Sequence, residues 1–530
     1  MPSEFDVVVV GAGFAGLYML KRLREQGWRA IVFEAGDGVG GTWYWNRYPG
    51  ARCDVPSIEY SFSFDPELEQ EWDWKERYAT QPEILAYLEH VAERYDLYRD
   101  IRLRTRVESA HFDESSGRWE VKTDDGETTM ARYVVMATGC LSSANMPDIP
   151  GRDSFEGDTY HTGRWPHHKV DFTGKRVAVI GTGSSGIQSI PLLAEEAEQL
   201  TVFQRTPNYS VPAHNQDHTP EYMQAVKDEY RAIRAENRVS PIGFGGRVRP
   251  AEANAMDLTP EQRAVELEKR WEEGGLTFLA AFMDVVFNPE ANAQVADFVR
   301  RKIASIVDDP EVAAMLSPDT YIGCKRLCVD TGYFATFNRP NVRLVDLRKT
   351  PIVQITPSGV RTSDETFEFD AIVFATGFDA MTGTLLRIDI QGRDGKTLKE
   401  AWAEGPKTYL GLSVPDFPNM FIITGPGSPS VLTNMVTSIE QHVEWITDCI
   451  NKMRDEGRRT IEAKPEDAEQ WVAYVNQIAG FTLYTNCNSW YLGANIPGKP
   501  RVFMPLFGFN TYEDVCKNVV EDDYRGFVRV

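Results

Sequence analysis

The sequence predicts an α/β protein with two parallel sheets, because two runs rich in Val and Ile each lead directly into a glycine-rich turn. The first run, Asp6–Val10, precedes glycines at positions 11, 13 and 16, and the second, Lys175–Ile180, precedes glycines at 181, 183 and 186. Apolar β-branched runs of this length are typical of buried parallel strands. A strand followed by this glycine spacing and a helix is typical of dinucleotide binding. We therefore predict two Rossmann-like dinucleotide-binding domains.

Composition and charge limit the possible partners. The 530 residues suffice for two or three domains. With 56 basic and 78 acidic residues, the net charge of -22 repels nucleic acid and anionic lipid surfaces. We therefore expect a small-molecule substrate, no nucleic-acid or membrane partner, and a monomer or weak oligomer. The start, Met1–Asp6, lacks the basic residues of a signal peptide, and no apolar stretch is long enough to cross a bilayer.

The cysteines predict a cytoplasmic protein. Seven are scattered along the chain without the spacing of metal ligands. This pattern favours a reduced complement without disulfides or a metal site.

The first glycine turn is expected to bind a cofactor with an unphosphorylated ribose. We predict a helix over Leu17–Glu25 and a second strand over Ala30–Phe33, which ends at Glu34. A carboxylate at this place accepts hydrogen bonds from ribose hydroxyls, which favours FAD or NAD. The predicted contacts of the turn itself are Gly11, Gly13, Ala15 and Gly16.

The second glycine turn is expected to bind NADPH. The strand after it, Leu200–Phe203, ends not in an acid but in Gln204, Arg205 and Thr206. Arginine offers a fork of donors to the 2′-phosphate of NADPH, which an acid would repel. The predicted contacts of the turn are Gly181, Thr182, Gly183, Ser184, Ser185, Gly186, Ile187 and Gln188. Two dinucleotides on one chain imply electron transfer between them.

Two Ala-Thr-Gly segments, at 137–139 and 375–377, predict where the chain crosses between the domains. We expect a FAD-binding domain in two parts, 1–141 and 384–530, and an NADPH-binding domain over 142–383. Within the latter, about 217–317 is rich in Glu, Ala and Arg and predicts a helical insertion. This insertion either walls a substrate cavity or serves as scaffold.

Two longer motifs carry a family resemblance. Residues 155–166 read Phe-x-Gly-x3-His-x3-Trp-Pro, and residues 40–54 hold Gly, Trp, Pro, Gly and Asp at set positions. Both resemble signatures of the flavin-dependent Baeyer-Villiger monooxygenases, nearest to the phenylacetone and steroid monooxygenases, with the cyclohexanone monooxygenases further away. The resemblance runs almost end to end. One departure is Phe507–Asn510, where relatives have a glycine pair.

The resemblance implies an NADPH- and O2-dependent enzyme that converts a ketone to an ester or lactone, with sulfide oxidation as a further activity. Such enzymes form a C4a-peroxyflavin, whose anion needs a fixed positive charge. The resemblance assigns Arg326 as this charge and Asp54 as the carboxylate that orients it. Arginine suits the role because it stays protonated when desolvated. Bound NADP+ and a closed Trp490 loop would exclude water.

The same resemblance implies further site residues. For NADP they are Arg52, Cys53, Asp54, Lys325, Arg326 and Trp490. For FAD they are Thr42, Trp43, Tyr44, Trp45, Tyr60, Val107 and Met435, although core packing is an alternative for the aromatic ones. The substrate pocket would be lined by Ser430, Val431 and Leu432. The resemblance places His161 in a hinge between the domains. It either transmits domain motion or is simply packed and hydrogen-bonded, and direct proton transfer is a less favoured alternative.

Three other function classes stay open. An N- or S-oxidising flavin monooxygenase is the main alternative, although Trp165-Pro166 and the pair of Arg326 and Asp54 favour ketone oxidation. A disulfide reductase needs two cysteines beside the flavin, and the nearest pair, Cys324 and Cys328, lacks that context. A flavin-binding sensor would not need both nucleotide sites.

Overall fold

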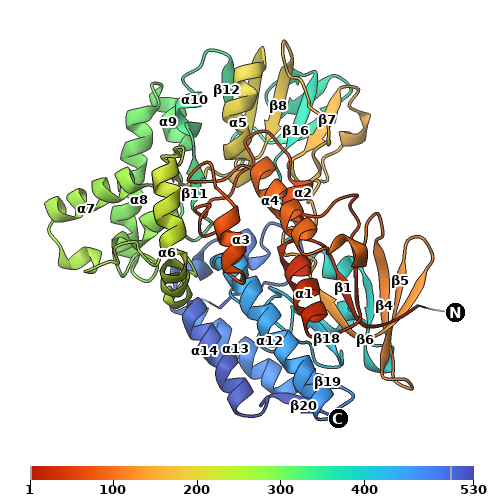
Figure 1. Ribbon diagram of the computed structural model, residues 1–530. Coiled ribbons are helices and arrows are strands. Elements are labelled where there is room, and N and C mark those ends of the chain that lie inside the picture. Colours follow the sequence, from red (N-terminus) through yellow and green to blue (C-terminus); the bar gives the residue numbers. More distant parts are fainter. Residues whose placement is uncertain (1–2, 502–503, 506) are drawn as a thin grey trace.

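The computed structural model describes residues 3–501, 504–505 and 507–530 and confirms the predicted α/β class with two sheets. The smaller sheet is parallel as predicted, whereas the larger one is mixed, because residues 107–136 add two antiparallel strand pairs to its parallel core. Figure 1 shows the sheets in different parts of the molecule, the larger at the right and the smaller at the top.

The larger sheet combines strands from both ends of the chain. Its eight strands, counted over the described residues, are β1 (Ser3–Val10), β2 (Ala30–Phe33), β3 (Ile101–Arg102), β4 (Val107–Asp113), β5 (Arg118–Thr123), β6 (Thr128–Met136), β17 (Asp389–Gln391) and β18 (Met420–Ile422). Their order is β17-β4-β5-β6-β1-β2-β3, and β18 also pairs with β6. β1 lies between β2 and β6, parallel to both, and its four valines are buried. A Val-rich run fits this place because parallel strands are covered on both faces.

Helices from the two ends of the chain cover this sheet. Helix α1 (Phe14–Glu25) begins at Phe14 rather than at the predicted Leu17, because the last glycine of the turn lies inside its first helical turn. Helix α12 (Met435–Asp455) packs against α1, and Trp28 Nε1 donates to Asn451 Oδ1 at 2.8 Å. Further helices of the chain ends are α2 (Thr42–Trp45), α3 (Pro66–Glu71), α4 (Gln81–Arg94), α11 (Leu398–Ala401), α13 (Pro465–Gly480) and α14 (Phe509–Glu521).

The smaller sheet is parallel throughout. In order its strands are β12 (Val342–Asp346), β9 (Gln199–Gln204), β8 (Arg176–Ile180), β16 (Ala371–Phe374) and β7 (Asp158–His161). Helix α5 (Ser184–Glu196) follows β8 through the second glycine turn. The remaining strands form small sheets: β10 (Ser210–Pro212) with β11 (Cys328–Asp330), β13 (Ile352–Thr356) with β14 (Gly359–Thr362) and β15 (Thr366–Glu368), and β19 (Ile461–Ala463) with β20 (Phe527–Arg529).

The predicted helical insertion is confirmed. It contains α6 (Pro220–Val239), α7 (Pro260–Glu273), α8 (Pro289–Ile306) and α9 (Pro310–Leu316), drawn in green in Figure 1, and α10 (Tyr333–Thr336) follows it. Each of the first four helices starts with proline after a residue whose side chain accepts a backbone N–H: Thr219, Thr259, Asn288 and Asp309. Proline suits the first position because its missing N–H would have no helical partner there. The predicted capping box between Thr259 and Gln262 is present.

The chain crosses between the sheets along two neighbouring segments. Asn145 N donates to Gly377 O at 2.9 Å, and Ala144 and Phe378 form an isolated bridge. The Ala-Thr-Gly segments end the strands before each crossing. The domain boundaries at 141 and 383 stay a prediction.

The departure at Phe507–Asn510 begins helix α14. Gly508 has φ +92, a value that favours glycine, and precedes the first helical residue. Phe509 N donates to Pro241 O at 2.7 Å, and the Phe507 ring lies 5.4 Å from that of Tyr474. This segment therefore anchors the C-terminal helix against the insertion.

The prediction of a fully reduced cysteine complement is wrong. Cys324 and Cys487 form a disulfide with 6.1 Å between their Cα atoms. The other described cysteines are free and buried: Cys53, Cys140, Cys328, Cys449 and Cys516. The bonded pair is 163 positions apart in sequence, so no local spacing could indicate it.

Neither a membrane-spanning helix nor a metal-binding cluster occurs in the described part of the chain. No helix there is long and apolar enough to cross a bilayer. No group of three His, Cys, Asp or Glu side chains is arranged to hold a metal ion.

A buried histidine on α12 couples stability to pH. Thr424 N donates to His442 Nδ1 at 2.9 Å, so the imidazole proton is on Nε2, which lies 2.9 Å from the Tyr512 hydroxyl. The Tyr512 hydroxyl in turn donates to Leu410 O at 2.7 Å. Burial lowers the pKa of His442 to about 3.

Acidification is expected to destabilise the protein through His442. The folded state keeps it neutral, whereas the unfolded chain protonates it below about pH 6.5, so stability falls by about 1.4 kcal/mol per pH unit from there toward the folded pKa. Between about pH 7 and pH 5.5, the thermal midpoint of the wild type should fall more than that of His442→Gln, which cannot titrate. Equal falls in the two proteins would contradict this assignment.

Candidate active site

The first glycine turn packs so closely that only glycine fits at two positions. A Cβ on Gly11 would lie 2.6 Å from Ala137 O, and one on Gly16 would lie 1.8 Å from Gly11 O. Helix α1 begins beside this turn with Gly13 as its N-cap, and no described side chain caps it. Its first N–H groups are therefore available to the phosphates of a dinucleotide. Ala15 is buried in the first turn of the helix.

Glu34 lies beside the first glycine turn, and its contact with a ribose stays a prediction. Its carboxylate accepts hydrogen bonds from Ala12 N at 2.8 Å and Gly36 N at 2.7 Å. Burial raises its pKa despite these bonds. The carboxylate is thus held beside the first glycine turn and is oriented by backbone groups rather than by a counter-charge.

The predicted FAD aromatics lie next to the same turn. Residues 42–45 form α2, and a Cβ on Gly13 would lie 3.3 Å from Gly41 Cα, so the start of α2 packs on the turn. Trp43 Nε1 donates to the Tyr60 hydroxyl at 3.3 Å. Trp43 and Tyr44 are buried, Thr42 is exposed, and Trp45 and Tyr60 are partly buried against the same core. These aromatic side chains pack in or against the core around the turn, and their contact with FAD stays a prediction.

Two other residues predicted to contact FAD lie at the starts of elements. Met435 opens α12 and packs against the core that contains α1. Val107 opens β4 and belongs to a different core cluster, with Val10 and Phe33.

The second glycine turn differs from the first because it leaves free space beside Gly183. A Cβ on Gly181 would lie 2.4 Å from Ala375 O, and one on Gly186 would lie 2.5 Å from Gly181 O. A Cβ on Gly183 would meet no described atom within 4 Å. Gly183 is also the N-cap of α5, so the space in front of this helix is open to a pyrophosphate. The residues present therefore fit a dinucleotide.

The other residues of the second turn have identified contacts. Ser184 Oγ lies 3.3 Å from Cys328 Sγ, Ser185 Oγ lies 3.2 Å from Thr162 Oγ1, and Thr182 Oγ1 donates to Thr206 O at 3.2 Å. Ile187 is buried in the core of the smaller sheet.

Gln188 connects this turn to the 40–54 motif. Its Nε2 donates to Arg52 O at 3.1 Å, and its Oε1 accepts from the Tyr48 hydroxyl at 2.8 Å. Arg52 itself donates to Glu76 at 3.0 Å. Arg52, Cys53 and Asp54 therefore lie beside the second nucleotide turn although they follow the first in sequence.

Two cations lie together at the end of β9. Burial lowers the pKa of Lys325, and the positive charge of Arg205 lowers it further. The negative charge of Asp319 acts on Lys325 in the opposite direction but more weakly. Two neighbouring cations suit a phosphate monoester, which is the group that distinguishes NADPH from NADH.

Arg326 and Asp54 form a two-point ion pair. Arg326 Nε donates to Asp54 Oδ2 at 2.6 Å and Nη2 donates to Oδ1 at 2.7 Å. A third bond runs from Nη1 to Val431 O at 2.7 Å. The two side chains are only 19% and 20% exposed. Burial by itself lowers the pKa of Arg326, but Asp54 and, to a smaller extent, Tyr491 raise it well above its usual value. The guanidinium therefore stays charged.

The predicted substrate residues lie beside this cation, which Val431 contacts directly. Ser430, Val431 and Leu432 form a short 3-10 turn, in which Ser430 has φ +46 and directs the Val431 carbonyl to Arg326. Val431 and Leu432 pack in an apolar cluster with Trp490 and Tyr491. The other members of this cluster are Cys140, Leu141, Ala380, Met381, Met435, Tyr484 and Met504.

Tyr491 is a site residue that the sequence did not indicate. It is buried, and its ring centre lies 4.4 Å from that of Trp490. Burial raises its pKa, whereas Arg326 lowers it. The neutral phenol is therefore the form beside the guanidinium. Its position directly after the predicted Trp490 was the only available signal.

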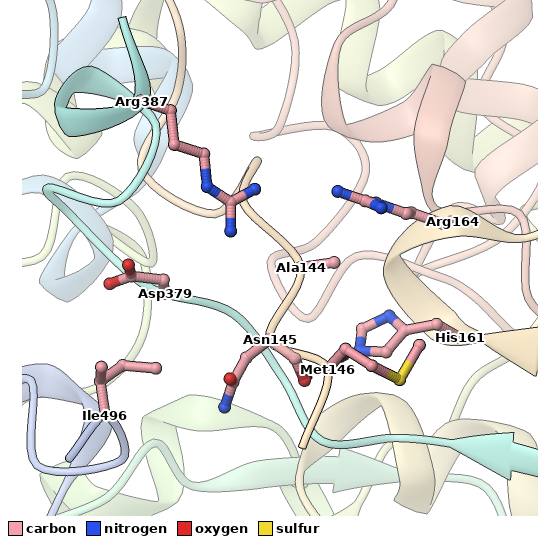
Figure 2. Close-up of a pocket in the computed structure, with 8 residues that line it drawn as sticks. All are labelled: Ala144, Asn145, Met146, His161, Arg164, Asp379, Arg387 and Ile496. Carbon is pink, nitrogen blue, oxygen red and sulfur yellow. Dashed lines mark hydrogen bonds between the residues drawn. The ribbon is translucent and has the colours of Figure 1, made fainter. Parts of the chain in front are cut away.

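His161 lies at the domain crossing, and none of its hydrogen bonds involves Arg326. Gly163 N donates to its Nδ1 at 2.9 Å, and its Nε2 lies 3.3 Å from Asn145 O and 3.2 Å from Thr376 Oγ1. Burial lowers its pKa. Figure 2 shows it at a cavity of about 350 Å³ lined by both crossing segments and by Ile496. These contacts favour a structural or hinge role over proton transfer.

Comparisons with known proteins agree with this geometry. The family described as pyridine nucleotide-disulphide oxidoreductase matches residues 8–244. A Baeyer-Villiger monooxygenase from Pseudooceanicola batsensis is 42% identical over 99% of this chain and 96% of its own length. A phenazine N-monooxygenase from Lysobacter antibioticus is also 42% identical, over 99% of this chain and 97% of its own.

The solved structure of an oxidized steroid monooxygenase bound to NADP is 52% identical to this chain. It superposes with a TM-score of 0.95 and covers 100% of both chains. Similarity of this extent, with both nucleotide turns and both longer motifs present, shows that the chain belongs to the family of FAD- and NADP-dependent Baeyer-Villiger monooxygenases.

Proposed function

We propose that this protein is an NADPH- and O2-dependent monooxygenase that inserts one oxygen atom next to the carbonyl of a ketone and releases an ester or lactone. The observation that carries the proposal is the buried, doubly bonded pair of Arg326 and Asp54 beside an apolar cluster. Bound FAD, once reduced by NADPH, supplies the electrons that activate dioxygen. The roles of the surrounding residues follow from their contacts.

Arg326 is proposed to hold negative oxygen in the pocket. A guanidinium has five N–H donors, of which Asp54 takes two and Val431 one, so two remain for Tyr491 and for a bound anion. Its charge would stabilise the anionic form of activated oxygen and then the negative charge that develops on the ketone oxygen. Asp54 fixes its direction, because both carboxylate oxygens are engaged.

The two glycine turns are proposed to bind the two cofactors. FAD would contact the 11–16 turn and Glu34, with the 42–45 helix, Tyr60 and Met435 packed around it. NADPH would contact the 181–188 turn, with Arg205, Thr206 and Lys325 at its 2′-phosphate. The larger sheet would then belong to the FAD domain and the smaller sheet to the NADPH domain, with boundaries near 141 and 383.

The substrate is proposed to be a neutral, apolar ketone. Val431, Leu432 and Met381 line the cluster beside Arg326, and Trp490 covers it with a large aromatic surface. The insertion contributes to the same region, since Asn434 N donates to Ile242 O at 2.7 Å. An apolar pocket with a single fixed cation binds a ketone by burial and orients its carbonyl by charge.

N-oxidation is the second candidate, because one relative of equal identity is named a phenazine N-monooxygenase. Product analysis with a panel of ketones and aromatic nitrogen heterocycles, with NADPH in air, separates the two. Ester or lactone formation supports ketone oxidation. N-oxides without any ester would overturn it.

Arg326→Ala is expected to separate NADPH oxidation from ketone oxidation. Without the cation, ester formation should fall by at least about 100-fold. NADPH should still bleach the flavin, because Arg326 is not needed for the second nucleotide turn to form. The control is Arg361→Ala, at an exposed position on β14. Ester formation retained in the Arg326 variant would refute its role.

Arg205→Ala is expected to weaken NADPH selectively. Loss of a charged, forked donor to a phosphate should raise the apparent KM for NADPH by about tenfold or more, and that for NADH much less. Steady-state kinetics with both coenzymes give the ratio of the apparent KM for NADPH to that for NADH. An unchanged ratio would count against a 2′-phosphate site at this position.

Gly183→Ala tests whether the free space beside Gly183 receives the pyrophosphate of NADPH. The added methyl meets no described atom, so the thermal midpoint should stay within about 2 °C while the apparent KM for NADPH rises about tenfold. Gly480→Ala is the matched control, since its Cβ also meets open space. Normal NADPH affinity in a stable Gly183 variant would argue against close nucleotide approach.

A further inference from the structure

The segment that carries Trp490 has little structure of its own. It comprises residues 481–501, named here the Trp490 loop, and follows α13. Its described residues contain only two 3-10 turns, Leu483–Asn486 and Trp490–Leu492, and no strand or α-helix. A segment without ladder or helix hydrogen bonds is positioned by its few side-chain and backbone attachments.

The noncovalent attachments hold both ends of the Trp490 loop. Near its start, Leu483 N donates to Val286 O of the insertion at 2.9 Å. Near its end, Asn495 Nδ2 donates to Phe378 O at 2.8 Å, and Lys499 Nζ lies 2.5 Å from Asp379 Oδ1. These bonds fix the loop to the insertion and to the domain crossing.

A covalent attachment holds the middle of the loop to the Arg326 segment. Cys487 precedes Trp490 by three residues, and its disulfide partner Cys324 precedes Arg326 by two. Both cysteines are buried: Cys487 is 5% exposed and Cys324 is 2% exposed. The bond therefore joins the cover of the apolar cluster to the segment before β11 that bears the proposed catalytic cation.

We propose that Cys324 and Cys487 form a redox modification site that holds the Trp490 loop closed over Arg326. With the bond formed, Trp490 and Tyr491 stay against Arg326, and water is excluded from the pocket. With the bond reduced, the loop opens more often, and more of the NADPH consumed yields hydrogen peroxide instead of ester. This inference rests on the proposed function, because it assigns the disulfide to the coupling of that reaction.

The oxidant is proposed to be hydrogen peroxide released by uncoupled turnover. One thiolate attacks the peroxide O–O bond and gives a sulfenic acid and one hydroxide, which takes the thiol proton to become water. The second thiol then displaces a second water and forms the S–S bond, so two thiols and one peroxide give one disulfide and two waters. Because both cysteines are buried when the loop is closed, oxidation acts on the open loop and closes it.

The neighbouring Cys328 does not compete for this bond. Asn208 Nδ2 donates to its sulfur at 3.2 Å, and Ser184 Oγ lies 3.3 Å away. Burial also raises the pKa of Cys328 to about 12, so its thiolate is scarce at neutral pH. The pairing is therefore specific to Cys487.

Thiol labelling tests whether the bond exists. Purified holoenzyme, treated with hydrogen peroxide, is denatured and alkylated with and without prior reduction, and its peptides are analysed by mass spectrometry. Cys324 and Cys487 should be alkylated only after reduction, whereas Cys449 and Cys516 should be alkylated in both samples. Alkylation of Cys324 and Cys487 without reduction would overturn the proposal.

The ratio of ester formed to NADPH consumed, which measures coupling, tests what the disulfide does. Cys324→Ala, Cys487→Ala and the double variant should each lower the ester formed per NADPH by about threefold or more, with equal effects because one bond is lost in all three. Dithiothreitol should lower the wild-type ratio to the same level and leave the variants unchanged, and peroxide should restore only the wild type. Cys516→Ala is the control. A wild type that labelling shows to be reduced but whose coupling is unchanged would overturn the proposal.

Limited proteolysis separates this proposal from the proposed function. Reduction should speed cleavage within 481–501 by about threefold or more in the wild type and not in the double variant, whatever reaction the enzyme performs. An enzyme that forms no ester in either redox state contradicts ketone oxidation. The cleavage rate still tests, independently of that reaction, whether the disulfide holds the Trp490 loop. Equal cleavage rates within 481–501 in the oxidised and reduced wild type would overturn the proposed role of the disulfide.

Discussion

The ion pair between Arg326 and Asp54 is the interaction on which the rest of the site depends. A charge with little exposure to water is costly unless its partner and hydrogen bonds compensate for it. Asp54 supplies both compensations through two bonds, and Val431 O supplies a third. The remaining donors of the guanidinium are thereby directed into an apolar cluster, where a positive charge acts on a bound anion more strongly than it would in water.

The fold makes this pair by placing segments from both nucleotide-binding halves side by side. Asp54 follows the first glycine turn, whereas Arg326 precedes β11 and lies beyond the second. Gln188 joins the second turn to Arg52 by a hydrogen bond to its carbonyl. The second glycine turn and the segment that carries Asp54 are therefore neighbours, although each glycine turn belongs to its own sheet.

The cover of the site is its least regular part. Both glycine turns are enforced by backbone contacts that exclude any side chain at Gly11, Gly16, Gly181 and Gly186. The segment with Trp490 and Tyr491 has no such enforcement and relies on separate attachments to the insertion, the domain crossing and Cys324. Rigid cofactor turns with a weakly structured cover suit an enzyme that must admit substrate and then exclude water.

The sequence by itself determined the two nucleotide-binding folds, the helical insertion and its capping box, because strand, glycine turn, helix and cap are each encoded within a few neighbouring residues. It also indicated Arg326 and Asp54, but only through motif resemblance. The tertiary structure alone decided that these two meet, that Tyr491 joins them and that Cys324 bonds to Cys487, against the prediction of reduced thiols. The reason is physical: contacts between residues 163 or 272 positions apart leave no local period or spacing in the chain, and only packing brings them together.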